Sequence, residues 1–325
     1  MRERLQIAPR LYALVALVAL AALALIVLTG AAVRLTGSGL GCPDWPKCYG
    51  GTVPPLETHA VIEYGNRLLT GFVGLAVIAA SALAWFRRPF RGHLALFGAM
   101  LPLGVLCQAI LGALVVKHHL APGLVMGHFI LSMLLLDAAF ALAWCARYEP
   151  GERCASSDRL GVWAVRALIP LGQLTIIAGT VATGSGPHAG AHEGELVHRF
   201  GFQGVETLEW VVQRHSAIAA AFGLAAIAVW LILRRRGGDG RASRPLAVVI
   251  GLLGLQGTVG ATQWALELPS ELVWLHIALA TTTWLAMLWT VATAGRLQPR
   301  PAAYSLTGPA AESSSAAKAP VHARL

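Results

Sequence analysis

The chain has 325 residues, of which 56% are hydrophobic and only 13% are charged, and its mean hydropathy is +0.63. These values lie outside the range of soluble globular domains and indicate an integral membrane protein. The formal net charge of +9 calls for no nucleic-acid partner, because the placement of the basic residues is explained by membrane orientation.

Eight apolar stretches are each long enough to cross roughly 30 Å of hydrocarbon as a helix that rises ~1.5 Å per residue. In chain order they cover residues 11–33, 62–86, 93–116, 123–146, 162–183, 212–234, 245–266 and 272–294. The sequence therefore predicts an all-α integral membrane protein with eight transmembrane helices, a multi-pass protein in the lipid bilayer of the cell membrane.

The basic residues predict the orientation of these helices. Eighteen of the 25 Lys and Arg residues fall in the first ten residues, in the loops after the second, fourth and sixth stretches, and in the C-terminal tail. Since Lys and Arg accumulate on the cytoplasmic side, we expect both termini to be cytoplasmic. The two long connections, 34–61 and 184–211, then lie outside and are candidates for lids or recognition surfaces.

One polar pattern occurs twice in the chain. Gln108 precedes His128 by the same spacing as Gln256 precedes His276, and each pair frames Gln-x-x-x-Gly, a proline and Leu-Val-x-x-His. So steady an offset indicates a duplicated unit. We therefore expect two tandem four-helix bundles, residues 1–150 and 151–296, followed by a disordered cytoplasmic tail at 297–325.

Four polar side chains lie near the outer starts of the even-numbered stretches: Asn66, His128, His215 and His276. Because these stretches all run from outside to inside, the four residues share a layer roughly 6–9 Å below the outer boundary. Polar side chains at that depth are costly and by default have a function.

His215 and His276 occupy places equivalent to Asn66 and His128. Two neutral imidazoles that face each other across a bundle suit axial ligation of a heme iron, and we favour this interpretation. The alternative is that each imidazole forms a hydrogen bond between helices. Zinc is less well supported, because neither histidine has a Cys or second His nearby at metal-ligand spacing.

Glu63 lies four residues before Arg67, so the two can form an ion pair along one helix face. The functional alternative is an acid/base or charge-stabilising carboxylate. Val212 stands where the second half would carry the equivalent of Glu63. The two halves thus share the same repeated pattern of residues but differ in chemistry. The first resembles a reactive site and the second an electron carrier.

Cys42 and Cys48 lie on the outer, oxidising side, with two prolines between them. A small-loop disulfide is expected there, either as a structural link or as an exchangeable dithiol. Arg67 and Arg214 are candidates to face heme propionates or simply to extend toward the interface. Weaker candidates for the polar edge of a porphyrin are the remaining outer histidines: His118, His119, His188, His192 and His198.

Three segments resemble the heme A synthase family: residues 33–48, residues 62–67 and residues 179–190, together with the His-bearing starts of helices 4, 6 and 8. The likeness runs from about Leu11 to Gly295. It implies an enzyme that oxidises a methyl group of heme O to a formyl group through a hydroxylated intermediate. The product, heme A, serves terminal oxidases, so heme O synthase and terminal-oxidase assembly factors are the expected partners.

The resemblance also implies roles for individual residues. His215 and His276 would hold a resident heme b in the second half, and His128 would bind the substrate heme in the first. Glu63 would be the essential carboxylate, and Cys42 with Cys48 the outer-loop disulfide.

One position departs from the family pattern Glu-x-x-His-Arg, because Asn66 replaces the histidine. Asn is a poor iron ligand, so the substrate heme would be held mainly through His128, with one axial face open. The same departure also fits a b-type electron-transfer protein without formyl-forming activity. A transporter, suggested by the parallel repeat, lacks an interrupted helix or an acidic relay to support it.

Overall fold

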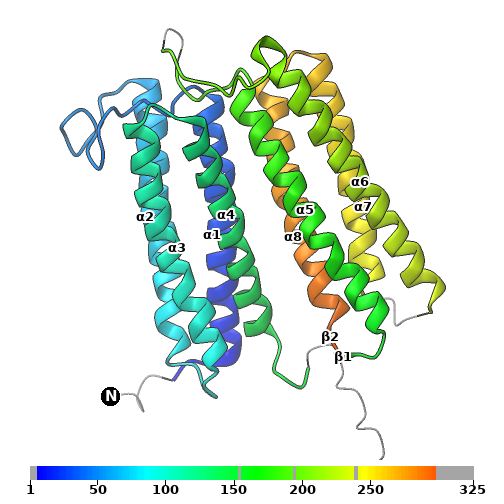
Figure 1. Ribbon diagram of the computed structural model, residues 1–325. Helices are drawn as coiled ribbons and strands as arrows, with labels where there is room; N and C mark the ends of the chain where they lie inside the picture. The colour runs from blue at the N-terminus through cyan, green and yellow to red at the C-terminus, as the bar shows by residue number, and fades with distance from the viewer. Residues whose placement is uncertain (1–5, 153–154, 193–194, 238–240, 298–325) are drawn as a thin grey trace, which may run out of the picture.

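Long helices make up most of the described part of the computed structural model, which covers residues 6–152, 155–192, 195–237 and 241–297 (Figure 1). They are α1 (Pro9–Leu35), α2 (Thr58–Ala84), α3 (Gly92–Lys117), α4 (Pro122–Arg147), α5 (Arg159–Ser185), α6 (Thr207–Arg235), α7 (Ser243–Ala265) and α8 (Ser270–Ala294). Each is long and apolar enough to cross a membrane. The predicted all-α membrane fold is confirmed, whereas the predicted disordered tail lies, from residue 298, outside the described residues.

Three short elements were not predicted. A 3-10 turn, η1 (Gly204–Glu206), precedes α6, and β1 (Ala155–Ser156) pairs in parallel with β2 (Arg296–Leu297). The strand pair joins the segment before α5 to the end of α8. Strands of two residues are too short to leave a periodic signal in the sequence.

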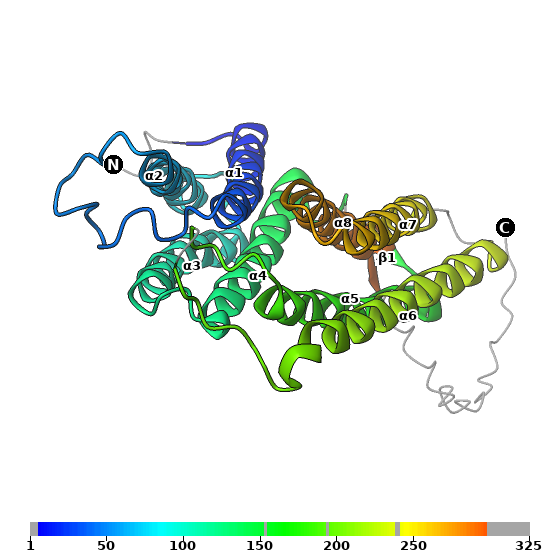
Figure 2. The ribbon, with the colours of Figure 1, turned by 90° about the horizontal axis from the view of Figure 1, so that it is seen from above.

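The helices pack as two groups of four. Helices α1 to α4 contact one another, as do α5 to α8, and the groups meet where α4 lies against α5 and α8 and where α1 lies against α8 (Figures 1 and 2). Small buried residues such as Ala16 and Ala80 bring α1 and α2 close together, and Tyr12 donates a hydrogen bond to the Ala80 carbonyl at 3.1 Å. The duplication and the boundary near residue 150 remain predictions.

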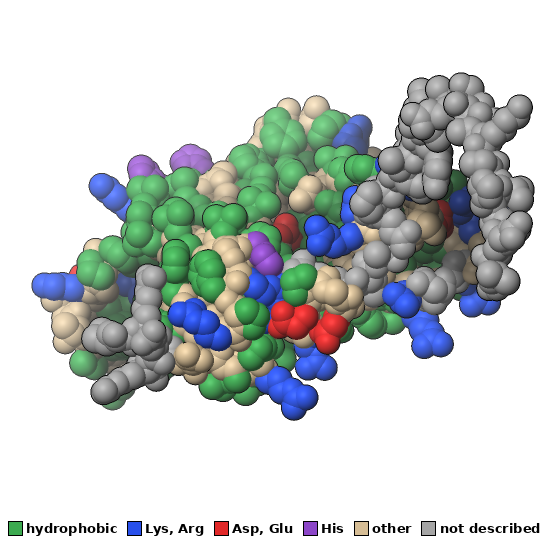
Figure 3. All heavy atoms as spheres, turned by 90° about the horizontal axis from the view of Figure 1, so that it is seen from below, with side chains coloured by type: hydrophobic (Ala, Val, Ile, Leu, Met, Phe, Trp, Pro, Cys, Tyr) green, Lys and Arg blue, Asp and Glu red, His purple; other side chains and the backbone are tan. Residues whose placement is uncertain are grey.

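The lower face in Figure 1 holds the ends of the helices that the basic residues assign to the cytoplasm. Lys and Arg side chains are spread over this face (Figure 3). Arg87 is fully buried and pairs with Glu149, while Arg91 donates to the carbonyl of Tyr148 at 3.1 Å. These bonds hold the α2–α3 loop against the end of α4.

The two long connections meet above the opposite helix ends. The Gly39 N–H donates to the Gly190 carbonyl at 2.7 Å, and the rings of His59 and His192 stack with centroids 5.3 Å apart. A methyl group on Gly41 would lie 2.2 Å from the carbonyl oxygen of His59, so only glycine permits this approach of the loop to α2. The two outer connections, one from each group of helices, therefore form a single layer over the outer helix ends.

Candidate functional site

His215 on α6 and His276 on α8 face each other inside the second group of helices. Their ring centroids are 6.3 Å apart and their planes are inclined by 69°. An iron bonded to one nitrogen of each ring at about 2 Å would separate the centroids by about 6 Å. The Nδ1 atoms of both rings are buried and have no hydrogen-bond partner within the described residues. A buried ring nitrogen without a hydrogen-bond partner destabilises the folded protein unless a ligand binds it. A heme iron between the two imidazoles is a ligand that fits this arrangement.

Each of these rings packs on a glycine of the neighbouring helix. A methyl group on Gly179 of α5 would lie 3.1 Å from Cε1 of His215, and one on Gly260 of α7 would lie 3.2 Å from Cε1 of His276. Gln256 also donates to the carbonyl of His276 at 3.0 Å. The bare backbone therefore sets the position of each imidazole, and a larger residue would displace the ring.

His128 on α4 has the same surroundings in the first group. A methyl group on Gly112 of α3 would lie 3.5 Å from Cε1 of His128. Gln108 donates to the carbonyl of His128 at 3.0 Å and to Ser132 Oγ at 2.6 Å. The Nδ1 atom of His128 is likewise buried without a described partner. The arrangement of glutamine, histidine and glycine thus occurs in both groups.

The fourth place, which Asn66 of α2 occupies, is different. Its Oδ1 accepts a hydrogen bond from Thr29 of α1 at 2.8 Å. The glycine that corresponds to Gly179 is Gly30, at the same offset as His215 from Asn66. No described atom lies within 4 Å of a methyl group built on Gly30. The first group therefore retains Gly30, the glycine that leaves room for an imidazole (called the glycine seat below), but the imidazole itself is missing.

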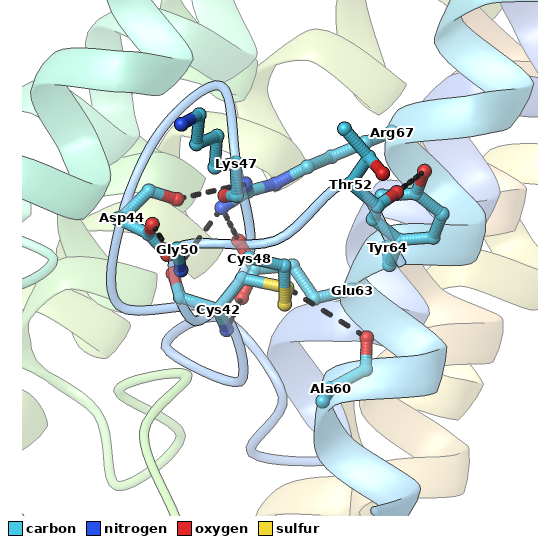
Figure 4. Close-up of a disulfide and its surroundings, with 10 residues drawn as sticks. All are labelled: Cys42, Asp44, Lys47, Cys48, Gly50, Thr52, Ala60, Glu63, Tyr64 and Arg67. Atoms are coloured by element: carbon cyan, nitrogen blue, oxygen red, sulfur yellow. Dashed lines mark hydrogen bonds and ion pairs between the residues drawn. A yellow bond between two sulfur atoms is a disulfide. The ribbon is translucent and has the colours of Figure 1, made fainter. Parts of the chain in front are cut away.

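Glu63 and Arg67 hold the outer disulfide loop on α2 (Figure 4). Cys42 and Cys48 are bonded to each other, and the backbone N–H of Cys42 donates to one oxygen of Glu63 at 2.7 Å. The other oxygen of Glu63 pairs with Arg67. Glu63 is only 6% exposed. The predicted ion pair is therefore present, and it forms part of the seat of the loop.

The guanidinium of Arg67 also binds the backbone of that loop. It donates to the carbonyls of Asp44 and Lys47 at 2.9 Å and to that of Cys42 at 3.3 Å. The loop is closed further by Asp44, whose carboxylate accepts from the Gly50 N–H at 2.8 Å. That hydrogen bond lowers the pKa of Asp44.

The two arginines considered for heme propionates are engaged elsewhere. Arg67 holds the disulfide loop, and Arg214 lies 3.7 Å over the ring of Trp210 while donating to the Trp210 carbonyl. The loop contacts of Arg67 could not be foreseen from spacing along the chain, whereas Arg214 and Trp210 are four residues apart on α6 and share a helix face. A role for either residue toward a propionate remains a prediction.

Two of the remaining histidines make contacts in the outer loops. His188 contacts the carbonyl of Leu268 at 2.7 Å and so joins the second outer loop to the turn before α8. His192 stacks on His59, and His118 and His119 follow the end of α3. These contacts indicate that His188 and His192 link the outer loops.

Asp137 of α4 is a polar residue that the sequence analysis did not single out. Its Oδ1 accepts a hydrogen bond from the indole N–H of Trp284 on α8 at 2.7 Å, across the boundary between the two groups. A signal was available, because a lone aspartate after three leucines inside a transmembrane stretch is itself unusual.

Within the described residues, no three or more His, Cys, Asp or Glu side chains gather to hold a bare metal ion. A heme iron needs only one or two protein ligands, because the porphyrin supplies the others. The fold therefore defines a multi-pass membrane protein, and the facing imidazoles of His215 and His276 fit a heme. The chain belongs to the COX15-CtaA family of cytochrome oxidase assembly proteins, whose model matches residues 13–288.

Individual relatives agree with this assignment. The chain is 29% identical over 279 residues to protoheme IX farnesyltransferase of Thermus thermophilus, covering 82% of this chain and 45% of that protein. It is 34% identical over 122 residues to heme A synthase of Bacillus pumilus (37% and 39% covered) and 31% over 165 residues to that of Shewanella oneidensis (45% and 48%). The chain thus spans less than half the length of these relatives, and the expected resemblance to the heme A synthase family is confirmed.

Proposed function

We propose that this protein is a heme A synthase that oxidises the methyl group of heme O to a formyl group, through a hydroxylated intermediate, for terminal oxidases. The asymmetry between the two halves carries this proposal. One half has two facing imidazoles, as an electron carrier requires. The other has His128 and a buried carboxylate, Glu63, where the half with two imidazoles has Val212, as a site of reaction requires.

His215 and His276 would hold the resident heme b, which supplies one-electron transfer when it is bound. The support is their centroid spacing, their unpaired Nδ1 atoms and their glycine seats. Gln256 fixes the backbone of His276 and hence the direction of its ring. The protein's own contribution is to keep both rings neutral, buried and correctly spaced.

His128 would bind the iron of the substrate heme in the first half, on the side opposite Asn66. Glu63 would take up a proton or stabilise charge at the reacting methyl group. Glu63 is buried against the closed outer loop, which bonds to one of its oxygens while Arg67 pairs with the other, so opening of the loop would expose the carboxylate to a substrate. We therefore propose that the disulfide loop opens when heme O enters.

Heme O synthase and terminal-oxidase assembly factors are the proposed partners. The support is that a protein named protoheme IX farnesyltransferase contains, in less than half of its own length, a region similar to 82% of this chain. Heme O is poorly soluble, so direct transfer between two membrane proteins would keep it out of water.

The test is to express the chain together with a source of heme O and to extract the pigments. Formyl-bearing heme in the extract is the expected result. Protein that is present and loaded with heme, but yields no formyl-heme, would refute the proposal.

The second candidate is a b-type electron-transfer protein, and Asn66 is the observation that favours it. Glu63→Ala distinguishes the two, since a pure electron carrier should keep its function while an enzyme loses formyl production and retains its resident heme. Glu63→Gln is the matched control for the loop, because its amide oxygen still accepts from the Cys42 N–H. If both variants fail equally with an intact loop, the negative charge itself is required.

A further inference from the structure

A cavity of about 170 Å³ lies where the two groups of helices meet, between α4, α5 and α8. Its walls are mostly apolar, but Asp137 of α4 and Gln173 of α5 line it together with Trp284 of α8. None of these three residues belongs to the heme site described above.

The cavity is at mid-membrane depth. Asp137 lies nine residues beyond His128 on α4, hence ~13 Å further from the outer surface. Leu134 and Ile177, which also line the cavity, are 51% and 41% exposed, so the cavity is open on at least one side. A phospholipid head group cannot reach this depth, so a ligand there has to dissolve in the hydrocarbon.

The carboxyl group of Asp137 is held in a definite place. Trp284, which is 3% exposed, donates its indole N–H to Asp137 Oδ1 at 2.7 Å. The indole itself is seated against α5, because a methyl group on Gly172 would lie 2.9 Å from its Cζ3 atom. The polar wall of the cavity is thus built by contacts from three helices.

Two polar groups at the cavity are left without protein partners. Among the described residues, nothing donates to the second oxygen of Asp137, and the carboxamide of Gln173 forms no hydrogen bond. Hydrocarbon offers no replacement partner, so such groups are costly unless a bound molecule satisfies them.

The size and polarity of the cavity define the ligand. A cavity of about 150 Å³ holds a benzene-sized ring, so this one holds a single substituted ring with its hydrocarbon tail left in the bilayer. Oxygen atoms on opposite edges of that ring would meet both polar groups. A quinol donates one hydroxyl to the Asp137 carboxylate and the other to the Gln173 amide oxygen, whereas a quinone accepts from the Gln173 amide N–H and from Asp137 when that carboxyl is protonated. We propose that this cavity binds the head ring of a lipid-soluble quinone or its quinol.

This proposal goes beyond the proposed function and does not depend on it. The test uses the purified full chain with its resident heme in phosphatidylcholine nanodiscs, a short-tailed azidoquinone as photolabel, and mass spectrometry of the labelled peptides. We expect saturable labelling in α4 and α5 around Asp137 and Gln173, displaced by unlabelled quinone. Because no heme O is present, failure of the heme A synthase proposal would not alter this result.

Leu134→Trp fills the cavity while leaving the Asp137–Trp284 bond in place, and it should lower the labelling at least tenfold. Leu224→Trp is the matched control, because Leu224 is 69% exposed on α6, away from the cavity. An unchanged heme spectrum shows that each variant is folded. Labelling that does not saturate, that is equal in the two variants, or that an alkane of equal length displaces equally well would overturn the proposal.

Discussion

The open seat at Gly30 leads to a specific prediction: Asn66→His should restore a second imidazole to the first half. The seat offers room, since no described atom lies within 4 Å of a methyl group on Gly30, whereas the corresponding distance at Gly179 is 3.1 Å to the resident ring. The variant loses the Thr29–Asn66 hydrogen bond, which is worth about 1 kcal/mol. Thr29 keeps the carbonyl of Ile26 at 3.3 Å as a second acceptor, so the protein should still fold.

The expected result is a change in the heme of the first half from one protein ligand to two. Electron paramagnetic resonance and optical spectra should then report a second low-spin, two-nitrogen heme beside the resident one. Release of heme from the first half should slow at least tenfold, which corresponds to about 1.4 kcal/mol of added binding.

Two further variants test the reasoning. Gly30→Leu added to Asn66→His should block the new imidazole and restore the original spectrum. His215→Asn should produce the reverse effect in the second half and turn the resident heme into a singly ligated, high-spin one. If the spectrum of Asn66→His is that of the unchanged protein while heme remains bound in the first half, the correspondence between Gly30 and Gly179 has been misread.

Three other changes have defined outcomes. Gly260→Leu should displace the ring of His276 and lower the resident heme occupancy at least tenfold, whereas Gly257→Leu, at an open position on the same helix, should leave the heme spectrum unchanged. Replacing both Cys42 and Cys48 by serine should destabilise the outer loop by about 2 kcal/mol, seen as faster amide hydrogen exchange in that loop with the helices unaffected. The lowered pKa of Asp44 means that its bond to the Gly50 N–H is fully present above about pH 4 and is lost as the pH falls through that lowered value. Loop exchange corrected for the intrinsic rate should then rise on acidification, but not in Asp44→Asn; a rise in both would contradict it.

The helices and the layer of polar residues could be predicted because both follow from periodic or duplicated patterns. Hydropathy over a transmembrane length needs no tertiary information, and the repeat places His215 and His276 at one depth before any coordinates are known. Their facing rings, with centroids 6.3 Å apart, agree with that prediction.

The partners of Arg67 could not be predicted, because they depend on the path of an irregular loop. Spacing along α2 indicates the bond to Glu63 but not the three carbonyls that Arg67 binds in the disulfide loop. Gly30 was missed for another reason: a seat is recognised as open only after its counterpart, Gly179, is seen to be filled. Asp137 was overlooked although its setting in a leucine run marked it.

Two indole groups join the halves at different depths. Trp274 donates to the carbonyl of Leu28 on α1 at 3.0 Å, and Trp284 donates to Asp137 of α4 at 2.7 Å. Neither half can slide along the membrane normal against the other without breaking both bonds. The vertical register between the two proposed heme positions is therefore fixed by the folded chain, so a heme could enter or leave the first half without changing the distance that an electron would cross.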